Sequence, residues 1–186
     1  MTAQNRARPL APPRSQPVIS ADSLILRPLA MPDAVLLGLH AGDRRVATGT
    51  RSIPHPLPRG AAQAFIEAAL APDRDEDVWA IDGAPQGAAS LLGVVSLKAL
   101  DRSQSQIGYW VAPAFWHGGI ASAAVRALLA ANPHGATTIF AEVFQDNPVS
   151  ARLLTHAGFD YIGDAEAFSV ARGASVPTWT YLRKMP

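Results

Sequence analysis

The segment YWVAPAFWHGGIASAAVRALLAAN, residues 109–132, restricts the fold more than any other part of this chain. Its first residues are aromatic or β-branched, which is typical of a strand, and Pro113 ends that strand because proline has no N–H to donate. Gly118 and Gly119 then precede a stretch rich in alanine and leucine, which predicts a helix. A further strand is predicted at Thr137–Phe144, so a strand–helix–strand unit joins two parallel strands here.

The other predicted elements surround this unit with antiparallel pairs. Short polar connections join three successive strands at Val78–Gly83, Leu91–Leu100 and Ser105–Ala112, which predicts an antiparallel meander. The remaining predicted strands are Ser23–Leu29, 159–164 and 177–185, and the predicted helices are Met31–Gly42, Ala61–Ala71, Gly119–Asn132 and Pro148–His156. We therefore expect an α+β fold with a mixed, mostly antiparallel central sheet of about seven strands flanked by four helices.

Composition excludes several classes of protein. With 186 residues, 48% of them hydrophobic and 17% charged, the chain has the size and balance of one globular domain. The net charge of +1 and the absence of a basic patch argue against nucleic acid as a partner. No apolar run approaches the roughly 18 residues of a membrane span, so no membrane partner is expected. The chain has no cysteine, which excludes disulfides, thiolate metal sites and a cysteine nucleophile.

The first twenty residues differ from the rest of the chain. They contain arginines and prolines but no apolar segment of about 7–15 residues, so they do not read as a secretory signal. We expect a flexible arm over residues 1–20, a single domain over residues 21–186, and a cytoplasmic location. The five histidines show no metal-binding spacing, so we expect no metal. Whether the chain forms a homodimer stays open.

The glycine pair before the helix has two interpretations. Gly118 and Gly119 could simply make a tight turn into the helix. The first turn of that helix, however, is built from small residues that leave the backbone N–H groups accessible. A helix N-terminus carries about half a positive charge and several unpaired donors, and can therefore bind an anion without a basic side chain.

The residues around this pair resemble the acetyl-CoA-binding motif of the GNAT N-acetyltransferase superfamily, Q/R-x-x-G-x-G/A. Trp116 stands at the Q/R position, Gly119 at the glycine and Ala121 at the G/A position. A tryptophan there, after GYWVAPAF, is similar to the RimJ/RimL type. Downstream, AEVFQDNPVSARLLTHAGF (residues 141–159) resembles that family's pattern E-V-x-x-x-N-x-x-S-x-x-x-L-x-x-x-G-F. The resemblance extends over about residues 21–184.

The resemblance implies acetyl-CoA as cosubstrate. The pyrophosphate would lie on the backbone N–H groups of His117–Ser122, and the pantetheine arm would run along Tyr109–Val111 like an added strand. That strand carries a bulge in the family, which Gly108 would permit, although a glycine filling a tight sheet contact is an equal alternative. Asn147 would contact the pantetheine, cap the next helix, or do both. The residues expected to bind acetyl-CoA are Tyr109, Trp110, Val111, Trp116, His117, Gly118, Gly119, Ile120, Ala121, Ser122, Asn147 and Ser150.

Two residues are candidates for catalysis. Glu142 lies within an apolar strand, where burial would raise its pKa and suit it to act as a general base, although a glutamate paired near a strand end is the alternative. The resemblance assigns Ser150 a place near the thioester sulfur, where it could protonate the leaving thiolate. Leu154 stands where many GNAT enzymes have a tyrosine acid. This departure is tolerable because a thiol has a pKa of about 8.5 and leaves readily as a thiolate.

The acceptor pocket is assigned by position alone. The proline-rich loop Ile53–Pro58 lies where the family builds this pocket, so Arg51 and His55 are candidate substrate residues. The expected function is transfer of an acetyl group from acetyl-CoA to a primary amine, on a protein N-terminus or a small molecule. A catalytically silent acyl-CoA-binding module of the same fold is the alternative, because the usual tyrosine is absent.

Overall fold

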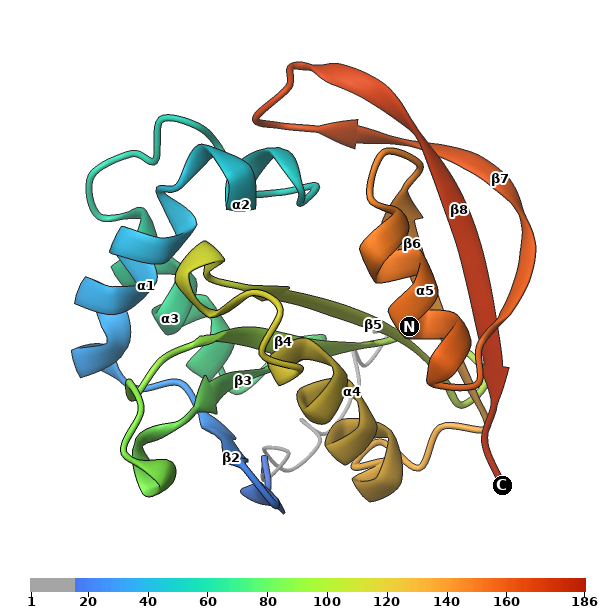
Figure 1. Ribbon diagram of the computed structural model, residues 1–186, viewed down its shortest axis with the longest axis horizontal. Coiled ribbons are helices and arrows are strands. Elements are labelled where there is room, and N and C mark those ends of the chain that lie inside the picture. Colours follow the sequence, from blue (N-terminus) through green and yellow to red (C-terminus); the bar gives the residue numbers. More distant parts are fainter. Residues whose placement is uncertain (1–15) are drawn as a thin grey trace, which may run out of the picture.

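A computed structural model describes residues 16–186, which form one eight-stranded mixed sheet with helices on both faces (Figure 1). The strand order in the sheet is β1-β2-β3-β4-β5-β6-β8-β7. The strands are β1 (Ile19–Ala21), β2 (Leu24–Pro28), β3 (Glu76–Asp82), β4 (Gly93–Ala99), β5 (Gln104–Val111), β6 (Thr138–Phe144), β7 (Asp160–Ser169) and β8 (Ala174–Lys184). The α-helices are α1 (Ala34–Ala41), α2 (Arg44–Thr48), α3 (Ala61–Leu70), α4 (Ile120–Ala131) and α5 (Pro148–His156).

This architecture confirms the predicted fold class. Strands β3, β4 and β5 form the expected antiparallel meander, and β5–β6, joined by α4, is the parallel pair. The eighth strand is β1, whose three residues are too short for a period-two pattern to reveal. Four helices have seven residues or more, as expected, and the five-residue α2 is an additional turn before the proline-rich loop.

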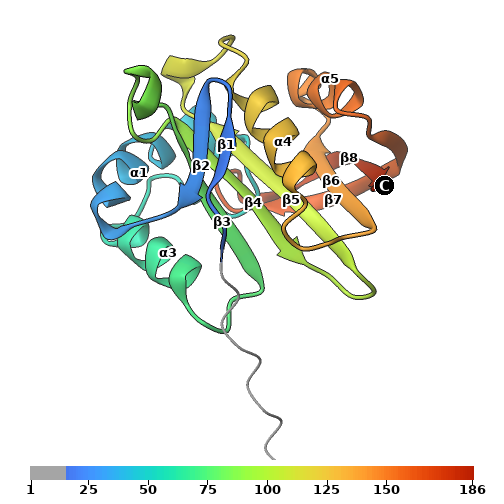
Figure 2. The ribbon, with the colours of Figure 1, turned by 90° about the horizontal axis from the view of Figure 1, so that it is seen from below.

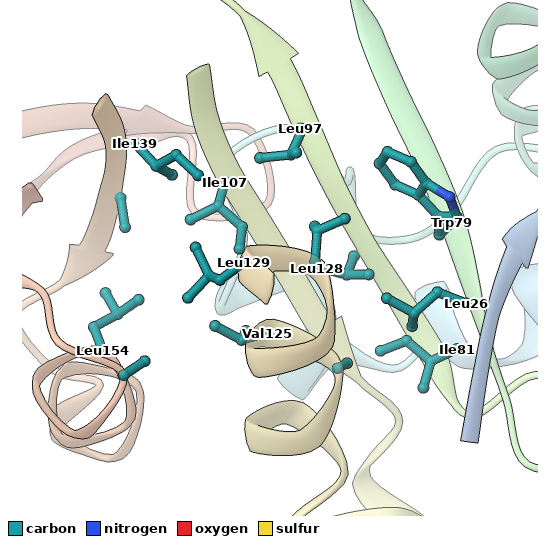
Figure 3. Packing of buried hydrophobic residues seen from close by; sticks show 14 of the residues in the cluster. Leu26, Trp79, Ile81, Leu97, Ile107, Val125, Leu128, Leu129, Ile139 and Leu154 are labelled. Carbon is teal, nitrogen blue, oxygen red and sulfur yellow. The ribbon is translucent and has the colours of Figure 1, made fainter. Parts of the chain in front are cut away.

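The two faces of the sheet are covered by different helices. Figure 2 shows α1 and α3 on one side of the strands and α4 and α5 on the other. On the α4 side, Val125, Leu128 and Leu129 pack against strand residues such as Leu97 and Ile107 (Figure 3). On the α1 and α3 side, a second apolar cluster includes Leu29, Leu37, Ile66, Val78 and Val94. Both faces of β3 and β4 therefore carry buried apolar side chains, as expected for central strands.

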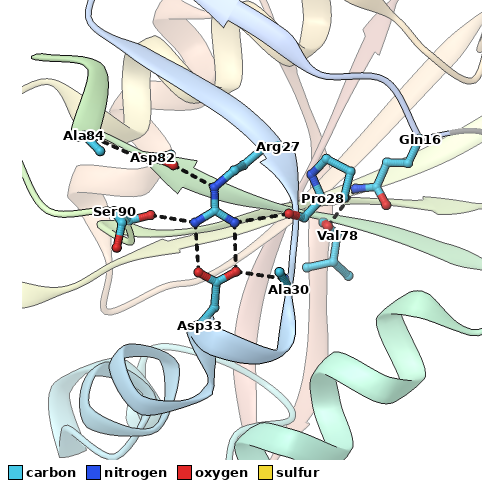
Figure 4. Close-up of polar contacts among 9 residues, drawn as sticks. All are labelled: Gln16, Arg27, Pro28, Ala30, Asp33, Val78, Asp82, Ala84 and Ser90. Carbon is cyan, nitrogen blue, oxygen red and sulfur yellow. Dashed lines mark hydrogen bonds and ion pairs between the residues drawn. The ribbon is translucent and has the colours of Figure 1, made fainter.

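A buried ion-pair network fixes the N-terminal edge of the sheet (Figure 4). The guanidinium of Arg27 on β2 donates two 2.8 Å hydrogen bonds to Asp33 and one of 2.6 Å to Asp82 on β3. Burial would raise the pKa of Asp33, but the bonds from Arg27 and the Ala30 N–H, with the arginine charge, hold that pKa below its ordinary value. The network thereby anchors the entry to α1 on the sheet.

A second buried network holds together the closed end of the parallel pair. The His134 ring lies between Ser105 Oγ, 2.9 Å from Nδ1, and Asp77 Oδ2, 3.0 Å from Nε2. Asp77 also accepts a 2.6 Å bond from Arg74. Because Ser105 lies at the start of β5, opposite Ile139 on β6, and Asp77 lies on β3, this network ties the turn after α4 to the sheet.

Part of the predicted N-terminal arm is packed on the domain. Gln16 donates a 2.7 Å hydrogen bond to the Val78 carbonyl, and the Trp79 indole donates one of 2.8 Å to the Pro17 carbonyl. Ile19 already belongs to β1. The rest of the predicted arm, residues 1–15, lies outside the described residues. Within residues 16–186, no helix is long and apolar enough to cross a membrane.

Candidate active site

The site lies where β5 and β6 separate. Their parallel pairing runs from Gln104 and Thr138 to Ile107 and Ala141 and then stops, although both strands continue. The Ala112 N–H donates to Leu92 on the β4 side. Because successive N–H groups of a strand point to opposite sides, those of Tyr109 and Val111 point toward the gap. Backbone donors therefore line one wall of this opening.

The alternatives for Gly108 are decided by the register. The β4–β5 pairing is continuous from Gly93 opposite Val111 to Ala99 opposite Ser105, so β5 carries no bulge in this pairing. A Cβ added at Gly108 would lie 3.1 Å from Ser96 Oγ. Gly108 therefore fills a tight sheet contact, which was the second of the two interpretations.

The loop before α4 presents a row of unpaired backbone donors. Gly119 is the N-cap of α4 at φ 72°, and His117 also has a positive φ of 64°. Within residues 16–186, the N–H groups from His117 to Ser122 make no hydrogen bond, and the first paired N–H of the helix is that of Ala123. Unpaired donors in this arrangement at a helix N-terminus are able to bind an anion.

Trp116 joins this loop to the strand. Its indole Nε1 donates a 2.7 Å hydrogen bond to the Val111 carbonyl, the last residue of β5. The guanidinium of Arg45 lies 5.7 Å from the center of the Trp116 ring. The side chain of His117 is exposed, so the loop offers its backbone rather than its histidine.

Glu142 on β6 lies on the side of the gap that faces α2 and the β7–β8 hairpin. Its Oε2 accepts a 2.5 Å hydrogen bond from Arg51, and its Oε1 accepts one of 3.0 Å from Thr178 Oγ1 on β8. The carboxylate side chain is 14% exposed, whereas that of Arg51 is 55% exposed. The glutamate is therefore paired through both oxygens, which is the alternative that the sequence left open for it.

The start of α5 forms the opposite side of the gap. Asn147 is the N-cap, and its Oδ1 accepts a 3.2 Å hydrogen bond from the Ser150 N–H. Tyr109 reaches across from β5, with its hydroxyl 3.5 Å from the Ser150 carbonyl. Burial raises the pKa of Tyr109 to about 12, so this hydroxyl stays protonated.

One cavity of about 940 Å³ connects these groups. Of the sequence-predicted site residues, its lining includes Arg51, Tyr109, Trp110, Glu142, Asn147 and Ser150. The loop at residues 116–122 and Val111 do not line this cavity. The Trp116 indole bonds to the Val111 carbonyl, next to the lining residue Trp110. His55 is exposed and outside the lining, beside Asp43, so the cavity does not support its assignment to the acceptor pocket.

Comparison with known proteins identifies the family. A family model described as an acetyltransferase (GNAT) domain matches residues 23–160, about three quarters of the chain. The chain belongs to the GNAT acetyltransferase family. It is accordingly an acetyl-CoA-dependent N-acetyltransferase, and the resemblance to the RimJ/RimL type is confirmed.

Three relatives place this GNAT enzyme more closely. The uncharacterized N-acetyltransferase YoaA of Bacillus subtilis (strain 168) is 25% identical over 170 residues, covering 89% of this chain and 95% of YoaA. The Microcin C7 self immunity acetyltransferase MccE, solved with acetyl-CoA and AMP, superposes with a TM-score of 0.75 at 19% identity, covering 88% and 93%. RimL, a ribosomal L7/L12 alpha-N-protein acetyltransferase solved with CoA, superposes with a TM-score of 0.75 at 17% sequence identity, and the match covers 91% of this chain and 98% of RimL. The last two share the fold.

Sequence reasoning missed the residues that the β7–β8 hairpin brings to this GNAT site. Thr178 carries no motif, and its contact with Glu142 depends on the β6–β8 register. Beyond it, Ser169 Oγ donates to the Thr50 carbonyl at 3.3 Å, the Val170 N–H to the Arg51 carbonyl at 2.9 Å, and Arg172 Nε to the Thr48 carbonyl at 2.8 Å. We call these three contacts the hairpin clasp. The clasp holds the hairpin over the cavity and fixes the backbone of Arg51.

Within residues 16–186, no group of three or more His, Cys, Asp or Glu residues has the arrangement of a metal site.

Proposed function

We propose that this enzyme moves an acetyl group from acetyl-CoA to a primary amine by direct attack, with Glu142 as the general base. The observation that supports this most is the position of Glu142 on the wall of the cavity, beside the gap between β5 and β6. An amine that enters from the α2 side would meet the carboxylate next to the backbone donors of β5. Proximity and orientation of this kind supply much of the rate in two-substrate reactions.

The residues at the gap fit acetyl-CoA. Six consecutive unpaired N–H groups at the start of α4 suit a pyrophosphate, and the positive end of the helix dipole favours its charge. The outward N–H groups of Tyr109 and Val111 suit an extended arm that pairs with β5 as a strand would. Since Asn147 caps α5 through Oδ1 alone, its Nδ2 remains free within the described residues to bind the same arm.

The proposed chemistry uses few groups. Acetyl-CoA supplies the acetyl group as a thioester, whose C–S bond breaks as the C–N bond of the amide forms. Glu142 accepts the proton that the amine loses, since each of its oxygens keeps a lone pair beside the bonds from Arg51 and Thr178. The N–H of Val111 stabilises the charge that develops on the carbonyl oxygen. Ser150 Oγ, which has no hydrogen-bond partner among the described residues, can donate to the departing sulfur.

A single moderate base suits a weakly basic amine. An α-amino group has a pKa of about 7.7–8.0, so roughly a tenth of it is neutral at pH 7, whereas a lysine side chain at about 10.4 is almost entirely charged. Glu142 therefore has to remove a proton from a smaller fraction of the α-amine than of the lysine amine. We therefore propose an α-amine, or another amine of similar basicity, as the acceptor.

The test is release of free thiol from acetyl-CoA in the presence of a panel of amines. Amine-dependent release by the wild type, lost in Glu142→Ala, is expected. If CoA binds in a calorimetric titration but no amine stimulates release, the chain is the silent acyl-CoA-binding module instead. Ser150→Ala should lower the rate far less than Glu142→Ala, because the thiolate leaves readily without an acid.

A further inference from the structure

The lining of the cavity carries two charged side chains of each sign. Glu76 and Glu142 are the carboxylates of the lining, and Arg51 and Lys98 are its cations. Glu142 is held by Arg51. Lys98 lies opposite Glu76 in the β3–β4 pairing, but its Nζ pairs with Asp75 Oδ2 at 3.1 Å. Within the described lining, the two carboxylates lie on β3 and β6, with β4 and β5 between them, so they form no cluster for a second or third positive charge on an acceptor.

Large apolar side chains, in contrast, face this cavity while remaining exposed. Phe65 on α3 is 41% exposed, Phe168 on β7 is 58% exposed and Val170 beyond it is 47% exposed. They come from two separate walls, and Trp110 and Phe144 line the cavity as well. Exposed apolar surface in a concave site favours a ligand with an apolar body.

The hairpin clasp keeps the second wall in place. Arg172 bonds to the Thr48 carbonyl and, through both terminal nitrogens, to Asp146 just before α5. Its guanidinium also lies 4.8 Å from the center of the Phe144 ring. Phe168 and Val170 are therefore presented by a segment that is tied to α2 and to the β6–α5 loop.

We propose that the acceptor is a primary monoamine carrying a bulky apolar group, and that Phe65, Phe168 and Val170 select it. This inference rests on the proposed function, since it takes Glu142 as the point where the amine is held. The amine would supply one positive charge beside Glu142, and the apolar group would cover the exposed side chains of the two walls. A polyamine would place further charges against these apolar side chains, which is unfavourable.

A primary amine beside a bulky apolar group occurs both in small molecules and at peptide N-termini, and the assay distinguishes these two sources. Thiol release would be measured with phenylalaninamide, glycinamide, spermidine and the tripeptide Phe-Gly-Gly. We expect kcat/KM for phenylalaninamide to exceed that for glycinamide by about tenfold or more, as apolar contacts of this size produce. Phe-Gly-Gly matching phenylalaninamide indicates a peptide source, and its failure indicates a small amine. Spermidine or glycinamide equal to phenylalaninamide would overturn the proposal.

Variants of Phe65 and Phe168 test whether these two walls of the cavity select the apolar group. Phe168→Ser and Phe65→Ser should each reduce the preference for phenylalaninamide over glycinamide by at least about threefold. Ile162→Ser on β7 and Leu70→Ser on α3 are matched controls, because both residues are exposed and outside the cavity, and should leave it unchanged. Unchanged preference in both wall variants would overturn the proposal.

A binding measurement keeps the inference distinct from the proposed function. If no amine is acetylated, the proposed function fails, and calorimetric titration of phenylalaninamide in the presence of CoA decides the inference alone. Binding that Phe168→Ser weakens supports the apolar site. No binding, or binding equal in Phe168→Ser and Ile162→Ser, contradicts it.

Discussion

Replacement of Gly119 by valine tests whether backbone donors bind the pyrophosphate. Gly119 has a φ of 72°, and no atom lies within 4 Å of a Cβ built there, so the substitution meets no protein atom. The left-handed conformation costs a residue with a Cβ about 1–2 kcal/mol. The new methyl groups would also stand in the open space over the first turn of α4, where the phosphate is proposed to lie.

The expected loss of affinity follows from the donors. A hydrogen bond to a charged group contributes about 1.5–3 kcal/mol, so losing two of the six donors costs about 3–6 kcal/mol. The Kd for CoA should therefore rise about a hundredfold or more, since about 1.4 kcal/mol corresponds to a factor of ten. Isothermal titration calorimetry with CoA measures this, and chemical denaturation measures the accompanying change in stability.

Gly60→Val is the matched control. Gly60 is the N-cap of α3 at φ 77°, with no atom within 4 Å of a built Cβ, so the backbone strain is the same. Both variants should lose similar unfolding free energy, but only Gly119→Val should lose CoA binding. His117→Ala should leave the Kd within about threefold, because its side chain is exposed and the site uses backbone. A folded Gly119→Val protein with near wild-type affinity would refute the anion site.

Three further outcomes follow from individual contacts. Trp116→Phe loses the bond to the Val111 carbonyl and should reduce stability by about 1 kcal/mol and weaken CoA binding, by denaturation and calorimetry. Asp33→Asn breaks the pair with Arg27 and should cost about 3 kcal/mol at neutral pH. Because the folded pKa of Asp33 is lowered, this stabilisation is present above about pH 4 and lost on acidification, so the variant should show a flatter acid limb in denaturation across pH. Arg172→Ala opens the hairpin clasp and should raise KM for the amine several-fold with less effect on kcat, in steady-state kinetics.

The sequence predicts correctly those helices and strands for which capping residues, turn residues and hydrophobic periodicity all indicate the same element. The helix Pro148–His156 has its predicted bounds because an asparagine caps it, a proline occupies its first turn and Gly158 follows it at φ 81°. The meander was predictable from alternation and short polar turns. Strand β1 and helix α2, at three and five residues, are too short for periodicity to identify.

The site is less accessible to sequence reasoning because distant segments build it. Arg51 and Glu142 are 91 positions apart, and only the fold shows that they form an ion pair. Thr178 reaches Glu142 through the β6–β8 register, which no motif encodes. For Gly108, the family pattern and local chemistry allowed two interpretations, and only the β4–β5 register distinguished them.

The most direct test of the account compares amide formation by the wild type and Glu142→Gln at saturating acetyl-CoA. Mass spectrometry would follow the acetylated amine, and calorimetry would check that both proteins bind CoA equally. A positioned general base contributes about 10²–10⁴-fold, so kcat should fall by at least about a hundredfold in the variant while the Kd for CoA stays unchanged. Equal rates of amide formation in the two proteins would contradict the role of Glu142.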